Sequence, residues 1–258
     1  MSEVEQIEEN LKKLKKLGVS ETEIIKRYES KILSLKNGEL SCVFVENIKG
    51  ADVKAHGKAI IESKNLEWNY NFAKYVKGAD IKAHGKAVIE SKEPEWNYNF
   101  AKDIKGADVK AHGKAIIESK NLEWNYNFAK DVKGADKKAH EKVVLESKEP
   151  KWNLMFASDV KGADKKAHEK VVIESKNAMW NYYFARDVKG ADVMAHGRVI
   201  IESKDSRVND WFKEDFEDEY KILKENNFIN KAYNFIDNAL DEMIKENNEE
   251  NKSMQKRS

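Results

Sequence analysis

The chain has 258 residues, and its 47 basic and 46 acidic side chains give a formal net charge of +1. A single cysteine cannot form an intramolecular disulfide, which excludes a small disulfide-stapled scaffold. No stretch approaches the roughly 20 apolar residues that cross a bilayer, and the acidic segment MSEVEQIEEN is unlike a signal or transit peptide. We therefore expect a soluble, cytoplasmic protein.

Residues 1–21 are predicted to form an N-terminal capping helix. Val4, Ile7, Leu11 and Leu14 lie on one helical face with the a/d spacing of a coiled coil. A coiled coil normally needs three or four heptads, and residues 2–17 are too short for that. A cap is therefore favoured, and we expect a monomer, with dimerisation through residues 2–17 as the alternative.

A repeat of 28 residues organises the chain over residues 50–217. Residues 48–74 and 104–130 are identical. The string Gly-Ala-Asp returns at this constant spacing, starting at Gly50, Gly78, Gly106, Gly134, Gly162 and Gly190. Self-similarity at a fixed period indicates a repeat architecture, here with six clear copies.

Each copy predicts two short helices, which we call helix A and helix B. In the first copy Asp52 suits the N-cap of helix A over 53–63, and Asn65 suits the N-cap of helix B over 66–77. In two copies a proline follows the second cap, at the first helical position, where its missing N–H costs nothing. Helix B carries an apolar stripe that must be buried, formed in the first copy by Trp68, Phe72 and Val76.

Degenerate copies are predicted on both sides of the six. Residues 22–49 form the first, because a shift of 28 residues brings the stripe onto Leu40, Phe44 and Ile48. Residues 218–245 are predicted as a C-terminal capping repeat, with the stripe at Ile236, Leu240 and Ile244. Residues 246–258 lack apolar side chains to anchor them, and we expect a disordered tail.

Two short helices cannot hide such a stripe alone, but a stack of copies can. The sequence therefore predicts an all-α fold, a right-handed α-solenoid of stacked two-helix repeats with degenerate capping units.

One histidine stands at the same position of helix A in every copy: His56, His84, His112, His140, His168 and His196. Zinc ligands must lie about 2 Å from a common ion, whereas equivalent residues of neighbouring repeats lie about a helix diameter apart. We therefore expect no metal site and structural histidines that are hydrogen-bonded between repeats. A pH-sensitive ladder of histidines is the alternative.

An asparagine follows each tryptophan position, namely Asn69, Asn97, Asn125, Asn153, Asn181 and Asn209. We expect these amides to satisfy backbone groups between repeats. The alternative is a recognition ladder, because some helical repeats read RNA one base per repeat with polar side-chain pairs.

Pairs of lysines recur four residues apart on helix A and could align into a stripe. Such a stripe could bind RNA or single-stranded nucleic acid. Glutamates one turn further along offset this charge, so a solvated, salt-bridged face is favoured. The stripe consists of Lys54, Lys58, Lys82, Lys86, Lys110, Lys114, Lys138, Lys142, Lys166 and Lys170.

The positions of helix B beside the apolar stripe change along the chain towards more apolar and aromatic residues. Tyrosine, methionine and arginine are enriched at protein interfaces, which predicts a partner-binding surface. An equal alternative is that the tyrosine position is half-buried against the next copy. The residues concerned are Tyr70, Tyr98, Tyr126, Leu154, Met155, Tyr182, Tyr183 and Arg186.

No enzyme signature is present. The sequence has no phosphate-binding glycine loop, no GxSxG elbow and no HExxH motif, and Cys42 falls at a packing position. The glycine of helix A, Gly57 in the first copy, is replaced by Glu141 and Glu169, which predicts a position that faces solvent. We expect no catalytic residue and no cofactor.

The paired helices resemble α-solenoid repeats of the tetratricopeptide, HEAT and Sel1-like kinds, although 28 residues is shorter than their periods. The string KGADxKAHxKxxxESKxxxWNxxFA, over residues 49–204, is similar to uncharacterised tandem repeats of low-GC bacteria and their phages. This resemblance implies a helical array and carries no activity with it. We expect a non-enzymatic scaffold that binds another protein through one face, with nucleic-acid binding along the lysine stripe and a structural spacer as alternatives.

Overall fold

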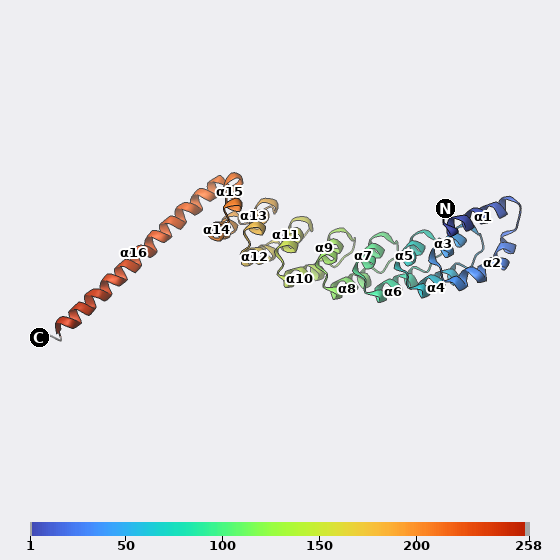
Figure 1. Cartoon of the computed structure of the whole chain (residues 1–258), viewed down its shortest axis with the longest axis horizontal. Coiled ribbons are helices and arrows are strands. Elements are labelled where there is room, and N and C mark those ends of the chain that lie inside the picture. Colours follow the sequence, from blue (N-terminus) through green and yellow to red (C-terminus); the bar gives the residue numbers. More distant parts are fainter. Residues whose placement is uncertain (1, 256–258) are drawn as a thin grey trace. The chain divides into compact units, whose positions relative to one another are not determined.

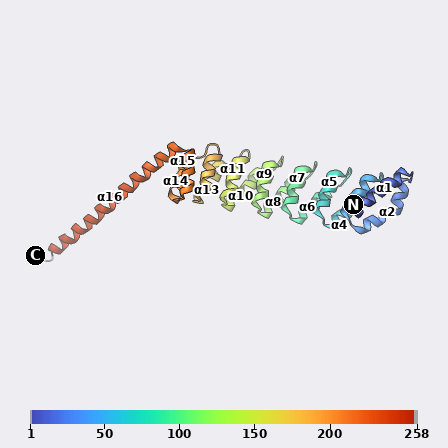
Figure 2. The ribbon, with the colours of Figure 1, turned by 45° about the horizontal axis from the view of Figure 1, so that its top comes forward.

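The computed structural model describes the backbone of residues 2–255 and the side chains of residues 2–245. Every regular element in these residues is an α-helix, which confirms the predicted all-α, solenoid-like fold. The chain divides into two compact units, Met1–Ser147 and Lys148–Ser258. Within each unit successive helix pairs lie side by side (Figures 1 and 2).

The helices of unit 1 are α1 (Glu3–Lys16), α2 (Glu21–Leu35), α3 (Gly38–Asn47), α4 (Val53–Ser63), α5 (Leu66–Tyr75), α6 (Ile81–Ser91), α7 (Pro94–Asp103), α8 (Val109–Ser119), α9 (Leu122–Asp131) and α10 (Lys137–Ser147). Those of unit 2 are α11 (Pro150–Asp159), α12 (Lys165–Glu174), α13 (Ala178–Asp187), α14 (Val193–Ser203), α15 (Ser206–Asp215) and α16 (Glu217–Gln255). Within each unit, a B helix packs against the A helix that follows it and against the B helix of the next repeat, as α7 does with α8 and α9.

Local hydrogen bonds fix where the helices of a repeat begin. The Asp52 carboxylate accepts a hydrogen bond from the backbone N–H of Ala55 at 3.0 Å, and Asn65 Oδ1 accepts one from Trp68 N–H at 3.1 Å. Both caps are the predicted ones. Helix α5 ends at Tyr75 and not at residue 77, because Val76 is extended, with φ −84° and ψ 115°.

Phenylalanine forms the centre of the core. The equivalent residues Phe44, Phe72, Phe100, Phe128, Phe156, Phe184 and Phe212 are all 0% exposed. Trp68 and its equivalents were predicted to be buried with them, but they are only half-buried. In the repeats of Trp96 and Trp124 the indole packs against the tyrosine of the preceding repeat, with ring centroids 5.9 Å apart for Tyr70 and Trp96 and 5.2 Å apart for Tyr98 and Trp124.

A lysine in the left-handed conformation links helix A to helix B in every repeat. The residues are Lys36, Lys64, Lys92, Lys120, Lys148, Lys176 and Lys204, with φ between 47° and 61°. This conformation costs a residue with a side chain roughly 1–2 kcal/mol. The linkers therefore store strain that glycine would not carry.

Replacing Lys64 by glycine is expected to raise the free energy of unfolding by about 0.5–1 kcal/mol, because the strain relieved exceeds the extra entropy of an unfolded glycine. Urea unfolding of the full chain, followed by circular dichroism, measures the change. Lys58→Gly in the middle of α4 is the matched control and should cost about 1 kcal/mol. Equal destabilisation by the two changes would contradict the strained linker.

The N-terminal helix covers the first repeat. Helix α1 packs on α3, and its Leu11 is 4% exposed, in a cluster with Ile24 and Phe44. Val4 and Leu14 pack against the same cluster. Most of the apolar face of α1 is therefore used within its own unit, as a capping helix requires.

Residues 218–245, expected to form a two-helix repeat, lie instead in the single helix α16 (Figure 1). No glycine or proline interrupts residues 217–255, so the chain has no signal to turn. The predicted stripe residues Ile236, Leu240 and Ile244 are 51–58% exposed. The segment expected to be a disordered tail continues this helix as far as Gln255, and residues 256–258 lie outside the described residues.

The start of α16 closes the last repeat. Leu223 is 5% exposed and packs against α14 at Gly197. A Cβ at Gly197 would lie 2.5 Å from both Leu223 Cδ1 and Phe212 Cζ. Glycine is therefore required here for the close approach of α16. Along the described part of the chain, no helix combines the length and apolarity that a membrane span needs.

Candidate functional site

Buried histidine–asparagine hydrogen bonds join successive repeats. Each joins histidine Nδ1 to asparagine Oδ1 fifteen residues earlier in the chain, and all these side chains are at most 1% exposed. The structure thereby confirms hydrogen bonds between repeats for these histidines, whereas His56 Nδ1 has no hydrogen-bond partner among the described residues. The pairs are His84–Asn69, His112–Asn97 and His140–Asn125 in unit 1, at 2.8 Å, and His168–Asn153 and His196–Asn181 in unit 2, at 2.7 Å.

The asparagine fixes which histidine nitrogen carries the proton. Asn97 Nδ2 donates to the carbonyl oxygens of Glu93 at 2.8 Å and Val88 at 3.2 Å, so these amides satisfy backbone groups as expected. Asn97 Oδ1 is then the acceptor for His112, whose Nδ1 must be protonated. His112 Nε2 is left as a buried lone pair without a hydrogen-bond partner among the described residues.

Burial keeps these imidazoles neutral. It lowers the pKa of His112 from 6.5 to about 4, against the opposing charge of Asp108 at the N-cap of α8. The pKa values of His84 and His140 fall to about 4 for the same reason. A proton added at Nε2 would therefore be an unpaired buried charge.

The glycine of helix A faces this Nε2. A Cβ at Gly85 would lie 3.4 Å from His112 Nε2 and 3.2 Å from Phe100 Cε1. The position is buried, so the expectation that it faces solvent is wrong. In unit 2 glutamate replaces the glycine at position 169, and its carboxylate reaches the next histidine, since Glu169 Oε1 lies 3.4 Å from His196 Nε2.

The tyrosines of helix B hold the next B helix. Tyr98 Oη donates to Asp131 Oδ2 at 2.6 Å, and Lys102 Nζ lies 2.6 Å from Tyr98 Oη and 3.3 Å from Asp131 Oδ2. The hydrogen bond from Tyr98 lowers the pKa of Asp131. Tyr70 bonds Asp103 in the same manner. Tyr182 likewise donates to Asp215 at 2.6 Å, so in these repeats the aspartate 33 residues after the tyrosine is its partner.

The predicted partner-binding residues are therefore not brought together on one open surface. Tyr98, Tyr126, Leu154 and Tyr182 are 4–8% exposed. Tyr70, Met155 and Tyr183 are half-buried and Arg186 is exposed. The arrangement matches the alternative in which this position packs against the next repeat.

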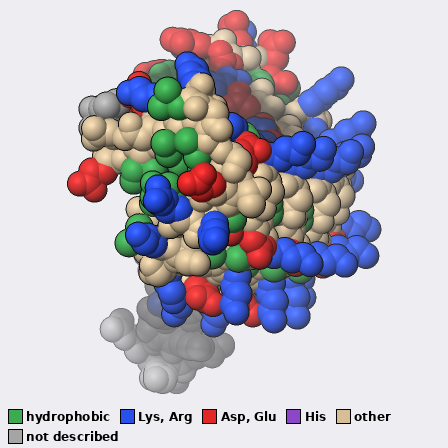
Figure 3. Space-filling view, turned by 90° about the vertical axis from the view of Figure 1, so that its right-hand side faces the viewer, with side chains coloured by type: hydrophobic (Ala, Val, Ile, Leu, Met, Phe, Trp, Pro, Cys, Tyr) green, Lys and Arg blue, Asp and Glu red, His purple; other side chains and the backbone are tan. Residues whose placement is uncertain are grey.

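The ten lysines of the predicted stripe are all exposed. Five of them pair with a glutamate four residues later: Lys58–Glu62, Lys86–Glu90, Lys114–Glu118, Lys142–Glu146 and Lys170–Glu174, at 3.7–3.9 Å. Figure 3 shows Lys and Arg side chains that project from the surface with Asp and Glu side chains between them. The A-helix face is a surface of mixed charge.

Grooves lie between successive A helices of unit 1. The groove between α8 and α10 has a volume of about 520 Å³, and the groove between α6 and α8 about 450 Å³. Seven lining positions of the two grooves are equivalent under the 28-residue repeat: Ile89 and Ile117, Lys92 and Lys120, Ala111 and Ala139, Lys114 and Lys142, Ala115 and Val143, Glu118 and Glu146, Ser119 and Ser147. The grooves are therefore copies of one site.

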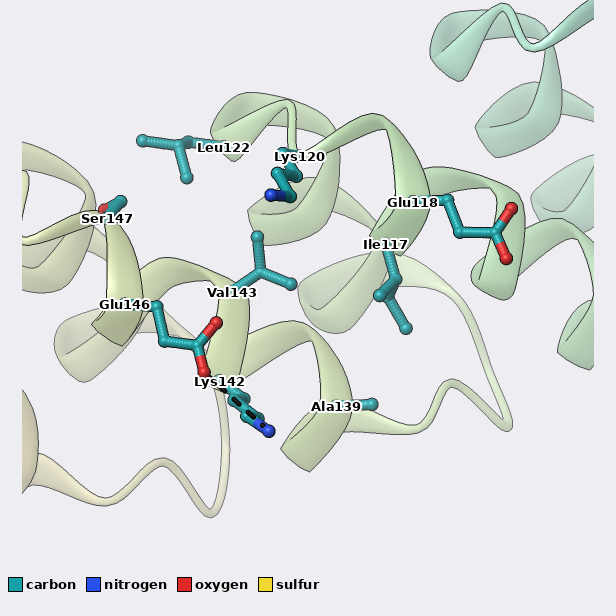
Figure 4. Close-up of a pocket in the computed structure, with 9 residues that line it drawn as sticks. All are labelled: Ile117, Glu118, Lys120, Leu122, Ala139, Lys142, Val143, Glu146 and Ser147. Atoms are coloured by element: carbon teal, nitrogen blue, oxygen red, sulfur yellow. Dashed lines mark ion pairs between the residues drawn. The ribbon is translucent and has the colours of Figure 1, made fainter.

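Each groove has an apolar floor and a charged rim. In Figure 4, Val143 points into the space between the two helices, with Ile117 opposite. The ion pair of Lys142 and Glu146 lies along the edge. The floor residues are not among the binding residues predicted from the sequence. The signal for them is that isoleucine at 89 and 117 and alanine at 111 and 139 recur with the 28-residue period.

Cys42 is a packing residue. It is 7% exposed, in a cluster with Ile60 and Phe72. Burial, together with the charges of Glu46 and Glu39, raises the pKa of its thiol to about 12. The thiol stays protonated and is a poor nucleophile.

Comparison with known proteins gives no relative: no protein-family model, no curated protein and no solved structure matches the chain.

Proposed function

We propose that the chain is a non-enzymatic helical-repeat scaffold of the cytoplasm that binds an extended segment of another protein along its A-helix face. The observation that supports this is the pair of equivalent grooves one repeat apart, each with an apolar floor and a rim of lysine and glutamate. Repeated sites of one kind suit a ligand whose own contacts recur at a regular spacing.

The spacing of the grooves defines the ligand. Packed helices lie about 8–10 Å apart, and an extended chain in the polyproline II conformation presents one face every three residues, with a rise of about 3.1 Å per residue. A polypeptide that crosses the A helices would place a side chain in successive grooves about every three residues. Apolar side chains suit the floor at Ile117 and Val143, and charged ones of either sign suit the rim.

The nucleic-acid alternative has less support. Lys114 and Lys142 each lie beside a glutamate, and a phosphate would have to displace that carboxylate. Phosphate binding also needs clustered positive charge, which a net charge of +1 does not supply. The other alternative is a structural spacer, and that function does not require grooves with an apolar floor.

Selection of displayed random peptides of about 12 residues on the full chain tests the proposal. We expect enriched peptides to carry apolar residues three positions apart. Ala115→Arg fills the groove between α6 and α8, and it should weaken binding of a selected peptide at least about tenfold, measured by fluorescence anisotropy.

Glu123→Arg introduces the same side chain at an exposed position of α9 that does not line either groove, and should leave peptide binding unchanged. An oligouridine probe covers the alternative, because phosphate contacts lose affinity steeply with added salt. Salt-sensitive binding of the RNA without any enriched peptide would contradict the proposal, and so would equal effects of the two arginine variants.

A further inference from the structure

Large apolar side chains gather on the exposed part of α16. Phe228, Tyr233 and Phe235 are 63–75% exposed. From residue 228 onward, five aliphatic side chains of the same helix are 46–62% exposed, namely Ile229, Ile236, Leu240, Met243 and Ile244. Apolar patches of this size mark interaction surfaces, and helices gain most of their stability from packing of an apolar face.

The apolar residues of α16 follow a heptad pattern. Steps of three and four residues connect Asn226, Ile229, Tyr233, Ile236, Leu240 and Met243. Ile229, Ile236 and Met243 lie at d positions of the heptad, and Asn226, Tyr233 and Leu240 lie at a positions. This row is shorter than the three or four heptads that a simple coiled coil needs, but a second row, Phe228, Ala232, Phe235 and Ala239, has the same spacing and widens the apolar face beyond a coiled-coil seam. We call the two rows together the α16 seam.

The polar residue in the α16 seam indicates a helical partner of defined register. A single asparagine at an a position is a known device that sets the register and oligomer state of coiled coils, at some cost in stability. Asn226 occupies the first a position of the α16 seam. An asparagine at this position is not expected on an apolar surface that binds its partners nonspecifically.

The exposed area is that of a stable interface. The three aromatic side chains alone expose on the order of 400 Å². With the five aliphatic ones, the total is on the order of 800 Å², which is about the area that one partner buries in a protein–protein interface of standard size. A partner helix that covers the α16 seam therefore removes enough apolar surface to hold a complex together.

The charge of α16 disfavours a lipid surface. Residues 217–245 contain seven acidic and four basic side chains. Helices that lie on membranes carry lysine and arginine on the polar face, which attracts anionic lipids. The polar face of α16 mixes Lys224, Lys231 and Lys245 with Asn227, Asn234, Asp237 and Asp241, so this helix has an excess of acidic over basic side chains and not the basic face of a membrane-surface helix.

We propose that the α16 seam is covered by α16 of a second copy of the chain, so that the protein self-associates through its C-terminal helix. Two copies of one helix present the same heptad pattern to each other, which meets the self-complementarity of a two-fold interface. The assembly departs from the monomer expected from the sequence, and it uses α16 in place of residues 2–17.

Sedimentation velocity of the full chain from about 1 to about 100 μM tests the proposal, because mass action makes an oligomer concentration-dependent. We expect an oligomer that Ile236→Glu combined with Leu240→Glu abolishes. Asn234→Glu combined with Asn238→Glu, on the polar side of the same helix, should leave it intact. Circular dichroism and thermal unfolding of both variants check that the repeats stay folded.

A cysteine at position 236 provides a second readout, because Cys42 is buried and does not compete. Ile236→Cys should form an α16–α16 disulfide on mild oxidation. A monomer at every concentration without this crosslink would overturn the proposal, and so would an oligomer that survives the two glutamates at positions 236 and 240. Binding of the monomer to phosphatidylglycerol vesicles, lost in that same variant, would assign the α16 seam to lipid and overturn it too.

Discussion

Replacing Asn97 by alanine is expected to lower the free energy of unfolding by about 3 kcal/mol. The change removes three hydrogen bonds, to His112 Nδ1 and to the carbonyl oxygens of Glu93 and Val88. It also leaves His112 with two unpaired ring nitrogens at 0% exposure, and an unsatisfied buried donor costs more than the bond itself is worth. Urea unfolding of the full chain measures the loss.

Asn99 provides the control for this change. It lies on the same helix, α7, but it is only half-buried. Asn99→Ala should therefore change the stability by no more than about 0.5 kcal/mol. Similar losses for the two variants would show that the histidine–asparagine pair does not hold the repeats together.

Acid is expected to destabilise unit 1 by about 2 kcal/mol for each of His84, His112 and His140 when the pH falls from 7 to 5. The folded imidazoles have pKa values of about 4, whereas those of the unfolded chain take up a proton below 6.5. The unfolded state therefore binds more protons between these values. The contribution of these neutral histidines to the free energy of unfolding is fully present above pH 6.5. It decreases as the pH falls and is lost completely below pH 4.

Gly85→Glu tests the origin of this acid sensitivity. The new carboxylate would take the place that Glu169 has beside His196 and would offer His112 Nε2 a charged acceptor. We expect the pKa of His112 to rise and the stability lost between pH 7 and pH 5 to shrink by about 1–2 kcal/mol. Gly85→Ala adds the Cβ without the carboxylate and should keep the full pH dependence. Urea midpoints at the two pH values compare them, and equal behaviour would refute the explanation.

The helix boundaries and the order of the repeats could be predicted because local residues determine them. Asp52 and Asn65 cap the helices that follow them, and the 28-residue period places every later helix. The stripe at Leu40, Phe44 and Ile48 also identifies the degenerate first repeat, since all three residues are at most 4% exposed.

Contacts between repeats were harder to predict because they join residues of different copies. Histidine and asparagine each recur with the repeat, but their pairing depends on how one repeat sits on the next. The same holds for Tyr98, whose partner Asp131 follows 33 residues later and makes burial of a polar ring favourable. Helix α16 was mistaken for a further repeat because its apolar spacing was considered without the absence of a turn signal.

The histidine–asparagine pairing gives each copy a donor side and an acceptor side. At one end His56 Nδ1 is buried without a hydrogen-bond partner among the described residues, and at the other Asn209 Oδ1 is likewise unmatched. Gain or loss of a whole 28-residue copy would reproduce the same junction and leave both termini unaltered. Unequal recombination between the identical segments 48–74 and 104–130 could thus lengthen or shorten the protein without creating any new interface.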